Sequence, residues 1–169
     1  MTLKIIRFLT IMFVSLSMAP AMAHLLEMPP KMDYDGAFWL KISQTLYGSR
    51  FGTVGAFFEV GAVVMSIILV FMVRHHKPAF VWSILGAVCM IAVHASFWIF
   101  IAPVNEKIAL MTPENLLNNW SALRQQWEYT HATRAYLHIV TMAAVTISIL
   151  VETSNNVLRK SNYELKVKL

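Results

Sequence analysis

Four residues at the start of the last apolar run of the chain have side chains suited to acid–base or metal chemistry. Glu128, His131, Arg134 and His138 follow one another at steps of three, three and four residues. On a helix, this spacing places all four side chains on one face. The run stays apolar to about Val151, so this face enters lipid, where an ionisable group is costly unless it faces protein or water. We therefore expect the face to point into a helix bundle.

The other apolar runs carry polar residues at a matching depth. Glu59 lies eight residues inside its run and His94 eight residues inside the next, counted from the same side of the membrane. At 1.5 Å per residue, both lie about 12 Å below the end of their helices. His24 and Glu27 close the first run at that side. We expect the polar residues of all four runs to meet in one half of the bundle.

Carboxylates and imidazoles in this arrangement are typical metal ligands. Carboxylate-bridged di-iron bundles take a Glu from each of two helices and Glu-x-x-His from each of the other two. The match here is partial, because His24-x-x-Glu27 reverses the motif and His94 stands where a Glu is expected. Iron or copper suits such a set, and manganese and zinc also fit. The predicted ligands are His24, Glu27, Glu59, His94, Glu128 and His131.

Structural interpretations compete with this site. Glu59 and Arg134 would also make an ion pair between helices, and His94 or His138 would also serve as a hydrogen-bonded interior residue. His24 and Glu27 would also simply mark the membrane boundary. All of these alternatives remain open on the sequence alone.

The composition indicates a membrane protein with one domain. The chain has 169 residues, of which 57% are hydrophobic and 14% charged, a balance far from that of soluble domains. Its net charge of +5 requires no nucleic-acid partner, because basic loops on the cytoplasmic side produce it. The single cysteine, Cys89, excludes an internal disulfide. We expect an all-α bundle of four transmembrane helices over residues 5–26, 51–73, 79–102 and 131–151.

The first apolar run has two interpretations. Lys4 and Arg7 precede an apolar core and Ala21-Met22-Ala23, a pattern typical of a signal peptide cleaved after Ala23. The run is also long enough to be the first membrane span. Cleavage would leave three spans, with His24 as the new N-terminus.

The connections between the runs predict the orientation. Basic residues stand at the start of the first run, in the turn at Arg74–Lys77, and in the tail at Arg159, Lys160, Lys166 and Lys168. All of these lie on one side of the membrane, so both termini are expected in the cytoplasm. If the chain is bacterial, the membrane is the inner membrane. The second long connection contains Thr112-Pro113-Glu114, a helix-start pattern. It predicts an amphipathic helix at the membrane interface over residues 113–127, ahead of the last span. Pro103 is expected to end the third span.

Several segments resemble the integral-membrane family that contains the anthrone oxygenases, most of whose bacterial and fungal members have no assigned activity. The matching pieces are residues 24–29 with Lys31, 46–52 with Glu59, 103–105, and Trp127 with 131–134. The resemblance implies a four-helix membrane fold with a retained first helix. For a minority of members, it implies oxygen insertion into an electron-rich aromatic compound.

Three functional hypotheses follow. The first is a membrane oxygenase or other oxidoreductase for a lipophilic aromatic substrate, with His131 as general base or metal ligand, Arg134 holding an anionic oxygen, and Glu59 assisting. The second is an electron carrier with haem b between His94 and His138. The third is a non-enzymatic membrane subunit or transporter, whose polar residues pair fully and leave no pocket. The substrate and the oligomeric state do not follow from the sequence.

Overall fold

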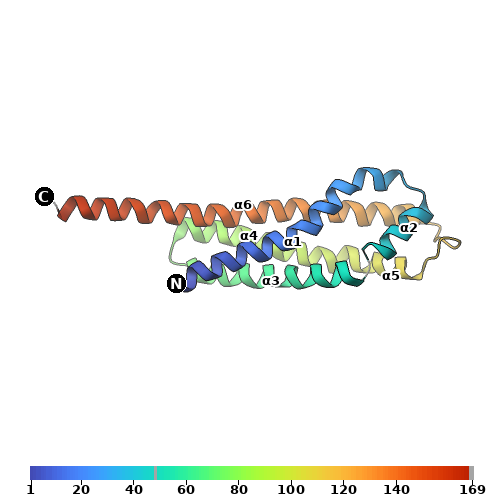
Figure 1. Ribbon diagram of the computed structural model, residues 1–169, viewed down its shortest axis with the longest axis horizontal. Coiled ribbons are helices and arrows are strands. Elements are labelled where there is room, and N and C mark those ends of the chain that lie inside the picture. The colour runs from blue at the N-terminus through green and yellow to red at the C-terminus, as the bar shows by residue number, and fades with distance from the viewer. Residues whose placement is uncertain (48, 168–169) are drawn as a thin grey trace.

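Four helices of this chain are long and apolar enough to cross a bilayer, as expected of a multi-pass membrane protein. The computed structural model describes residues 1–47 and 49–167, with side chains for 1–47 and 51–151. The side chains of the basic tail lie outside this part. The predicted all-α four-helix class is confirmed (Figure 1). The elements are α1 (Thr2–Asp33), α2 (Gly36–Thr45), α3 (Ser49–Val73), α4 (Lys77–Ser96), the π-helical turn η1 (Phe97–Ile101), α5 (Ala102–Leu110) and α6 (Trp120–Val167).

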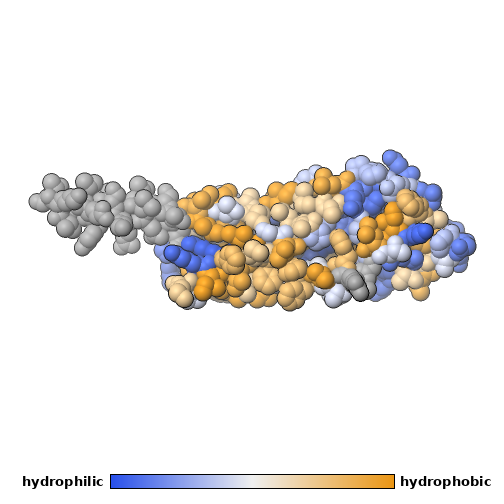
Figure 2. Space-filling view, in the orientation of Figure 1, coloured by the Kyte–Doolittle hydropathy of each residue, from blue (hydrophilic) through white to orange (hydrophobic). Residues whose placement is uncertain are grey.

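The long helices form a four-cornered bundle. α1 and α4 lie at opposite corners, and each packs against both α3 and α6. Small and apolar side chains fill the interior, among them Val14, Ala62, Met90 and Val93. Large apolar side chains such as Phe8, Phe57 and Val88 are exposed on the outside, and the face seen in Figure 2 is largely orange along the length of the bundle. An exterior of this kind is typical of contact with lipid.

The third span continues past the proline that was predicted to end it. Helical structure runs from Lys77 to Leu110, with Pro103 near the start of α5. Just before it, η1 widens the turn, and the Ala102 N–H donates to the Phe97 carbonyl five residues back. A π turn accommodates the missing N–H of a proline without ending the helix. The prediction that Pro103 ends the span is therefore wrong.

The separate interfacial helix predicted over residues 113–127 is also not observed. Thr112 and Asn115 exchange backbone hydrogen bonds in a turn, in which Pro113 occupies the position that prolines favour. The helix starts only at Trp120 and continues as α6. Because no Gly or Pro occurs between Glu114 and Val151, the sequence contains no signal to break the helix before the last span.

Two short helices cover one end of the bundle, here called the capped end, opposite the end where α1 begins (Figure 1). α2 packs against α5, and α5 against the first turns of α6. An apolar cluster joins them, with Trp39, Ile101, Leu123 and Trp127 buried in it. The Gln44 side chain donates hydrogen bonds to the Ile108 and Met111 carbonyls, at 2.8 and 3.0 Å. These contacts fix a cover over the polar half of the bundle.

Candidate functional site

A cavity of about 880 Å³ lies beneath this cover, between the four long helices. Most of the polar residues singled out from the sequence line it, and they come from all four spans. They are His24 of α1, Glu59 of α3, His94 of α4, and His131, Arg134 and His138 of α6. Glu27 and Glu128 are not in its lining. The predicted gathering in one half of the bundle is therefore observed for these six side chains.

Glu59 connects two of the predicted residues. One carboxylate oxygen lies 3.0 Å from the Nδ1 of His94, and the other pairs with the Arg134 guanidinium. The side chains of Glu59 and Arg134 are 10% and 9% exposed. The opposite charges of Glu59 and Arg134 therefore cancel in the cavity wall, and this compensation is needed because both groups are buried.

The hydrogen bonds of His94 determine which of its nitrogens carries the proton. The indole N–H of Trp98 lies 3.1 Å from the Nε2 of His94. An indole nitrogen only donates, so this Nε2 must accept, and the proton is on Nδ1, which donates to Glu59. His94 is thus a neutral imidazole oriented by a carboxylate, with its basic nitrogen covered by Trp98. An imidazole oriented in this way can accept a proton at Nε2 once the indole is displaced.

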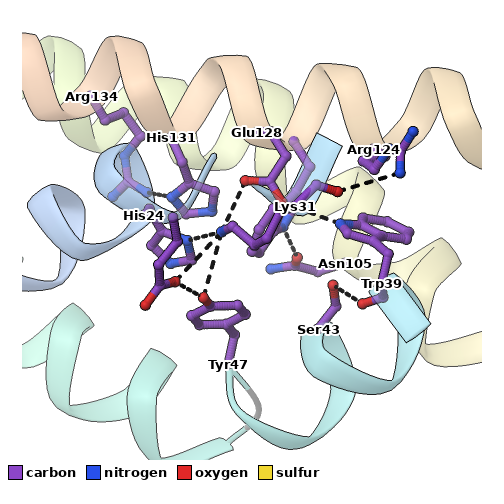
Figure 3. A network of polar contacts seen from close by, with 12 residues as sticks. His24, Lys31, Trp39, Ser43, Tyr47, Asn105, Arg124, Glu128, His131 and Arg134 are labelled. Carbon is purple, nitrogen blue, oxygen red and sulfur yellow. Dashed lines mark hydrogen bonds and ion pairs between the residues drawn. The ribbon is translucent and has the colours of Figure 1, made fainter. Parts of the chain in front are cut away.

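His24 and His131 have the opposite arrangement. Their rings stack at a centroid distance of 4.0 Å, nearly parallel. The Nδ1 of His24 lies 3.3 Å from the Lys31 ammonium, and that of His131 lies 3.4 Å from the Arg134 guanidinium. Both cations can only donate, so each imidazole carries its proton on Nε2. Figure 3 shows the two rings between Arg134 and Lys31. The cavity wall thereby has two neutral N–H donors.

Lys31, like Trp98, belongs to this centre but was not among the site residues predicted from the sequence. It is 2% exposed, and its ammonium lies 3.0 Å from Glu128 and 3.8 Å from Glu27. The other Glu128 oxygen accepts from the Trp39 indole at 3.2 Å. The ammonium also lies over the Tyr47 and Trp127 rings. Glu27 and Glu128 therefore pair with a lysine outside the cavity wall. Figure 3 shows Lys31 beside Glu128.

Tyr47 and Arg124 complete this network. The Tyr47 hydroxyl donates to Glu27, and burial, together with that carboxylate, raises the pKa of Tyr47 well above its ordinary value. The phenol therefore stays protonated and keeps donating. Arg124 donates to the Lys31 and Tyr34 carbonyls, at 3.3 and 2.5 Å. A basic side chain on the last carbonyls stabilises a helix end, here the end of α1.

His138 is a satisfied interior residue. Its Nδ1 donates to the Arg134 carbonyl at 2.8 Å, and its Nε2 accepts from Ser17 at 2.9 Å. His94 also has both ring nitrogens engaged, so haem ligation would require each of these residues to give up a hydrogen bond. The two do not fit the predicted axial pair of haem b as they stand.

The predicted metal ligands do not form one group. Within the described residues, no three His, Cys, Asp or Glu side chains are placed to hold a metal ion. Lys31 supplies the positive charge between Glu27 and Glu128, where the hypothesis placed a metal, and Arg134 supplies it beside Glu59. The metal hypothesis stays a prediction, and the chemistry proposed below does not depend on it.

Helical spacing contained a signal for the two missed residues. Lys31 lies four residues after Glu27 and seven after His24, hence on the same face if α1 continues through Pro29 and Pro30. Trp98 lies four residues after His94 in the same way.

Comparisons with models of known families, with curated proteins and with solved structures found no match to this chain. The resemblance to the anthrone oxygenases therefore stays a prediction.

Proposed function

We propose that this protein is a membrane oxygenase that removes a proton from a neutral, lipophilic aromatic substrate, whose anion then reacts with O₂. The observation that supports the proposal is that a proton acceptor and several hydrogen-bond donors line one cavity. His94, oriented by Glu59, offers a proton acceptor, while His24 and His131 offer N–H donors next to Arg134. A base opposite oxyanion donors suits the removal of a proton next to a carbonyl.

The charge balance supports a neutral substrate. Glu59 pairs with Arg134, and Lys31 with Glu128, so a permanent anion would find no unpaired cation among these groups. Negative charge that develops on a substrate oxygen during proton transfer would instead be stabilised by neutral imidazole N–H groups and by the adjacent guanidinium. Such donors act strongly where water is excluded.

His94 is the base in this reaction, in place of His131, which was predicted from the sequence. The Nδ1 of His131 already accepts from Arg134 and its Nε2 carries the proton, so it has no lone pair for a substrate. The Nε2 of His94 has one, which becomes available when Trp98 moves away. His131 and Arg134 then hold the substrate oxygen, as predicted for Arg134.

The overall reaction can be written for anthrone, the substrate class that the resemblance implies. His94 takes a proton from the ring CH₂ group, and the oxygen of the resulting enolate accepts hydrogen bonds from the donor side. The carbanion carbon combines with O₂, and loss of water from the peroxide leaves a new carbonyl. One anthrone and one O₂ yield one anthraquinone and one water.

The cavity also supports this proposal over the alternative of a non-enzymatic membrane subunit or transporter. The latter predicts that the polar side chains pair fully and leave no space between them. Instead, six of them line a cavity of about 880 Å³, a size that admits small organic ligands.

The test is oxygen uptake and anthraquinone formation by the purified protein in lipid nanodiscs supplied with anthrone. We expect faster conversion than in empty nanodiscs, with a loss of about 100-fold in His94→Gln, the usual contribution of a general base. His75→Gln is the matched control, because His75 is exposed in the turn at the opposite end. A wild-type rate equal to that of empty nanodiscs would reject the proposed reaction.

A further inference from the structure

The cavity is open along one side of the bundle. Some of its lining residues are exposed, at steps of four residues on α3 and of seven and four residues on η1 and α5, so the cavity reaches the surface between these two edges. Added Cβ atoms at Gly52 and Gly55 would meet nothing within 4 Å. We call this opening the slot; its edges are Gly52, Ala56 and Val60 on α3, and Trp98, Asn105 and Ala109 on η1 and α5.

The part of the slot near Val60 and Trp98 lies among exposed apolar side chains. Phe57 and Val60 of α3 are 65% and 48% exposed, and Trp98 and Ile99 of η1 are each 61% exposed. Apolar groups with this exposure in a membrane span contact acyl chains. The slot therefore connects the cavity with the hydrocarbon region of the bilayer.

Trp98 stands between this opening and the base. Its ring lies at the edge of the slot, and its N–H donates to the His94 Nε2 at 3.1 Å. The residue belongs to the π-helical turn η1, a type of backbone irregularity that is frequent at functional sites. A molecule that approaches His94 from the slot must displace this indole from its hydrogen bond.

We infer that the lipophilic substrate enters the cavity sideways from the bilayer through the slot, and that Trp98 is the gate that covers His94 until the substrate displaces it. This inference rests on the proposed function for the identity of its ligand. The route itself is a matter of access and can be measured without turnover.

A cysteine inside the cavity reports access. Ala21 lines the cavity and is 7% exposed, so Ala21→Cys, combined with Cys89→Ala to remove the native thiol, places one thiol at the wall. Labelling is compared in vesicles between N-(1-pyrenyl)maleimide, which partitions into the bilayer, and a charged methanethiosulfonate, which stays in water. We expect the bilayer reagent to label faster.

Two substitutions test the slot. Gly55 lines the cavity on α3, between the edge residues Gly52 and Ala56. A Cβ added there would have no other atom within 4 Å, so Gly55→Leu places a side chain in the slot without a clash at the Cβ, and it also improves helix propensity. We expect it to slow labelling by the pyrene reagent several-fold. Trp98→Ala should accelerate that labelling several-fold. Val54→Leu, on the same part of α3 but outside the cavity lining, is the matched control and should change neither rate.

The labelling rates decide whether the inference holds. Faster labelling by the charged reagent, or unchanged labelling in Gly55→Leu or in Trp98→Ala, overturns the inference. Because labelling requires no catalysis, failure to oxidise anthrone would reject the proposed reaction and leave the entry route standing, and the converse also holds.

Discussion

The ammonium of Lys31 lies 3.0 Å from a carboxylate oxygen of Glu128, and the two side chains are only 3% and 0% exposed. This ion pair joins the end of α1 to the start of α6 next to the cavity. Lys31 also lies 3.3 Å from the His24 Nδ1, so the pair that closes this end of the bundle also determines the proton position on a cavity histidine.

Removing one member of this pair should be far more damaging than removing both. Lys31→Met leaves Glu128 as an uncompensated buried charge, and Glu128→Leu leaves the buried ammonium with only the part-exposed Glu27 at 3.8 Å. Either variant should lower the stability by about 3–5 kcal/mol, whereas the double variant should lose much less. The measurement is thermal unfolding in detergent followed by circular dichroism. Lys41→Met, at an exposed position, is the control and should unfold like wild type. A double variant as unstable as the sum of both singles would contradict the expected coupling.

The same pair shows where sequence reasoning succeeded and where it stopped. The spacing of Glu128, His131, Arg134 and His138 placed four residues on one helix face correctly, because helical periodicity alone determines it. Lys31 lies outside the first span predicted over residues 5–26, and it follows Pro29 and Pro30, residues that normally interrupt a helix. In the structure, packing of α1 against α6 and the contacts of Arg124 carry the helix on to Asp33.

The hydrogen bonds between side chains of different helices could not be predicted in the same detail. The sequence placed Glu59, His94 and Arg134 at one level of the bundle, but not which nitrogen of each histidine carries a proton. That property depends on partners such as Trp98 and Lys31, which come into contact only once the helix ends and the π turn are known. The donor and acceptor sides of the cavity thus required the side-chain contacts themselves.

Glu59→Gln should reduce the oxidation of anthrone by about 100-fold through the turnover number, with little change in the Michaelis constant. The amide oxygen can still accept a hydrogen bond from the His94 Nδ1, but it carries no negative charge to raise the basicity of Nε2 or to balance Arg134. Substrate binding depends mainly on the donors of His24 and His131. Steady-state oxygen uptake in nanodiscs gives both constants. Glu106→Gln, at an exposed site on α5, is the control. A turnover number of Glu59→Gln equal to that of wild type would show that the carboxylate has no part in the reaction.

Metal analysis of the purified protein should give much less than one iron, copper, zinc or manganese per chain. The physical reason is the position of the two buried cations: Lys31 pairs with Glu128, and Arg134 with Glu59, so both carboxylates already have a positive partner. Elemental analysis after extensive dialysis provides the measurement, with oxygen uptake before and after chelation in parallel. A stoichiometric metal that is lost in Glu59→Gln would restore the ligand hypothesis.

Trp98→Phe should make the enzyme more efficient at low substrate concentration. The phenyl ring keeps the bulk of the gate but cannot donate to the His94 Nε2, so the substrate no longer displaces a hydrogen bond. One neutral hydrogen bond contributes about 0.5–1.5 kcal/mol, which corresponds to a rise in kcat/KM of roughly two- to tenfold. The measurement is oxygen uptake at anthrone concentrations well below KM. Trp120→Phe, which alters an indole outside the cavity lining, is the control. A fall in kcat/KM confined to Trp98→Phe would mean that the indole N–H assists the reaction rather than covering the base.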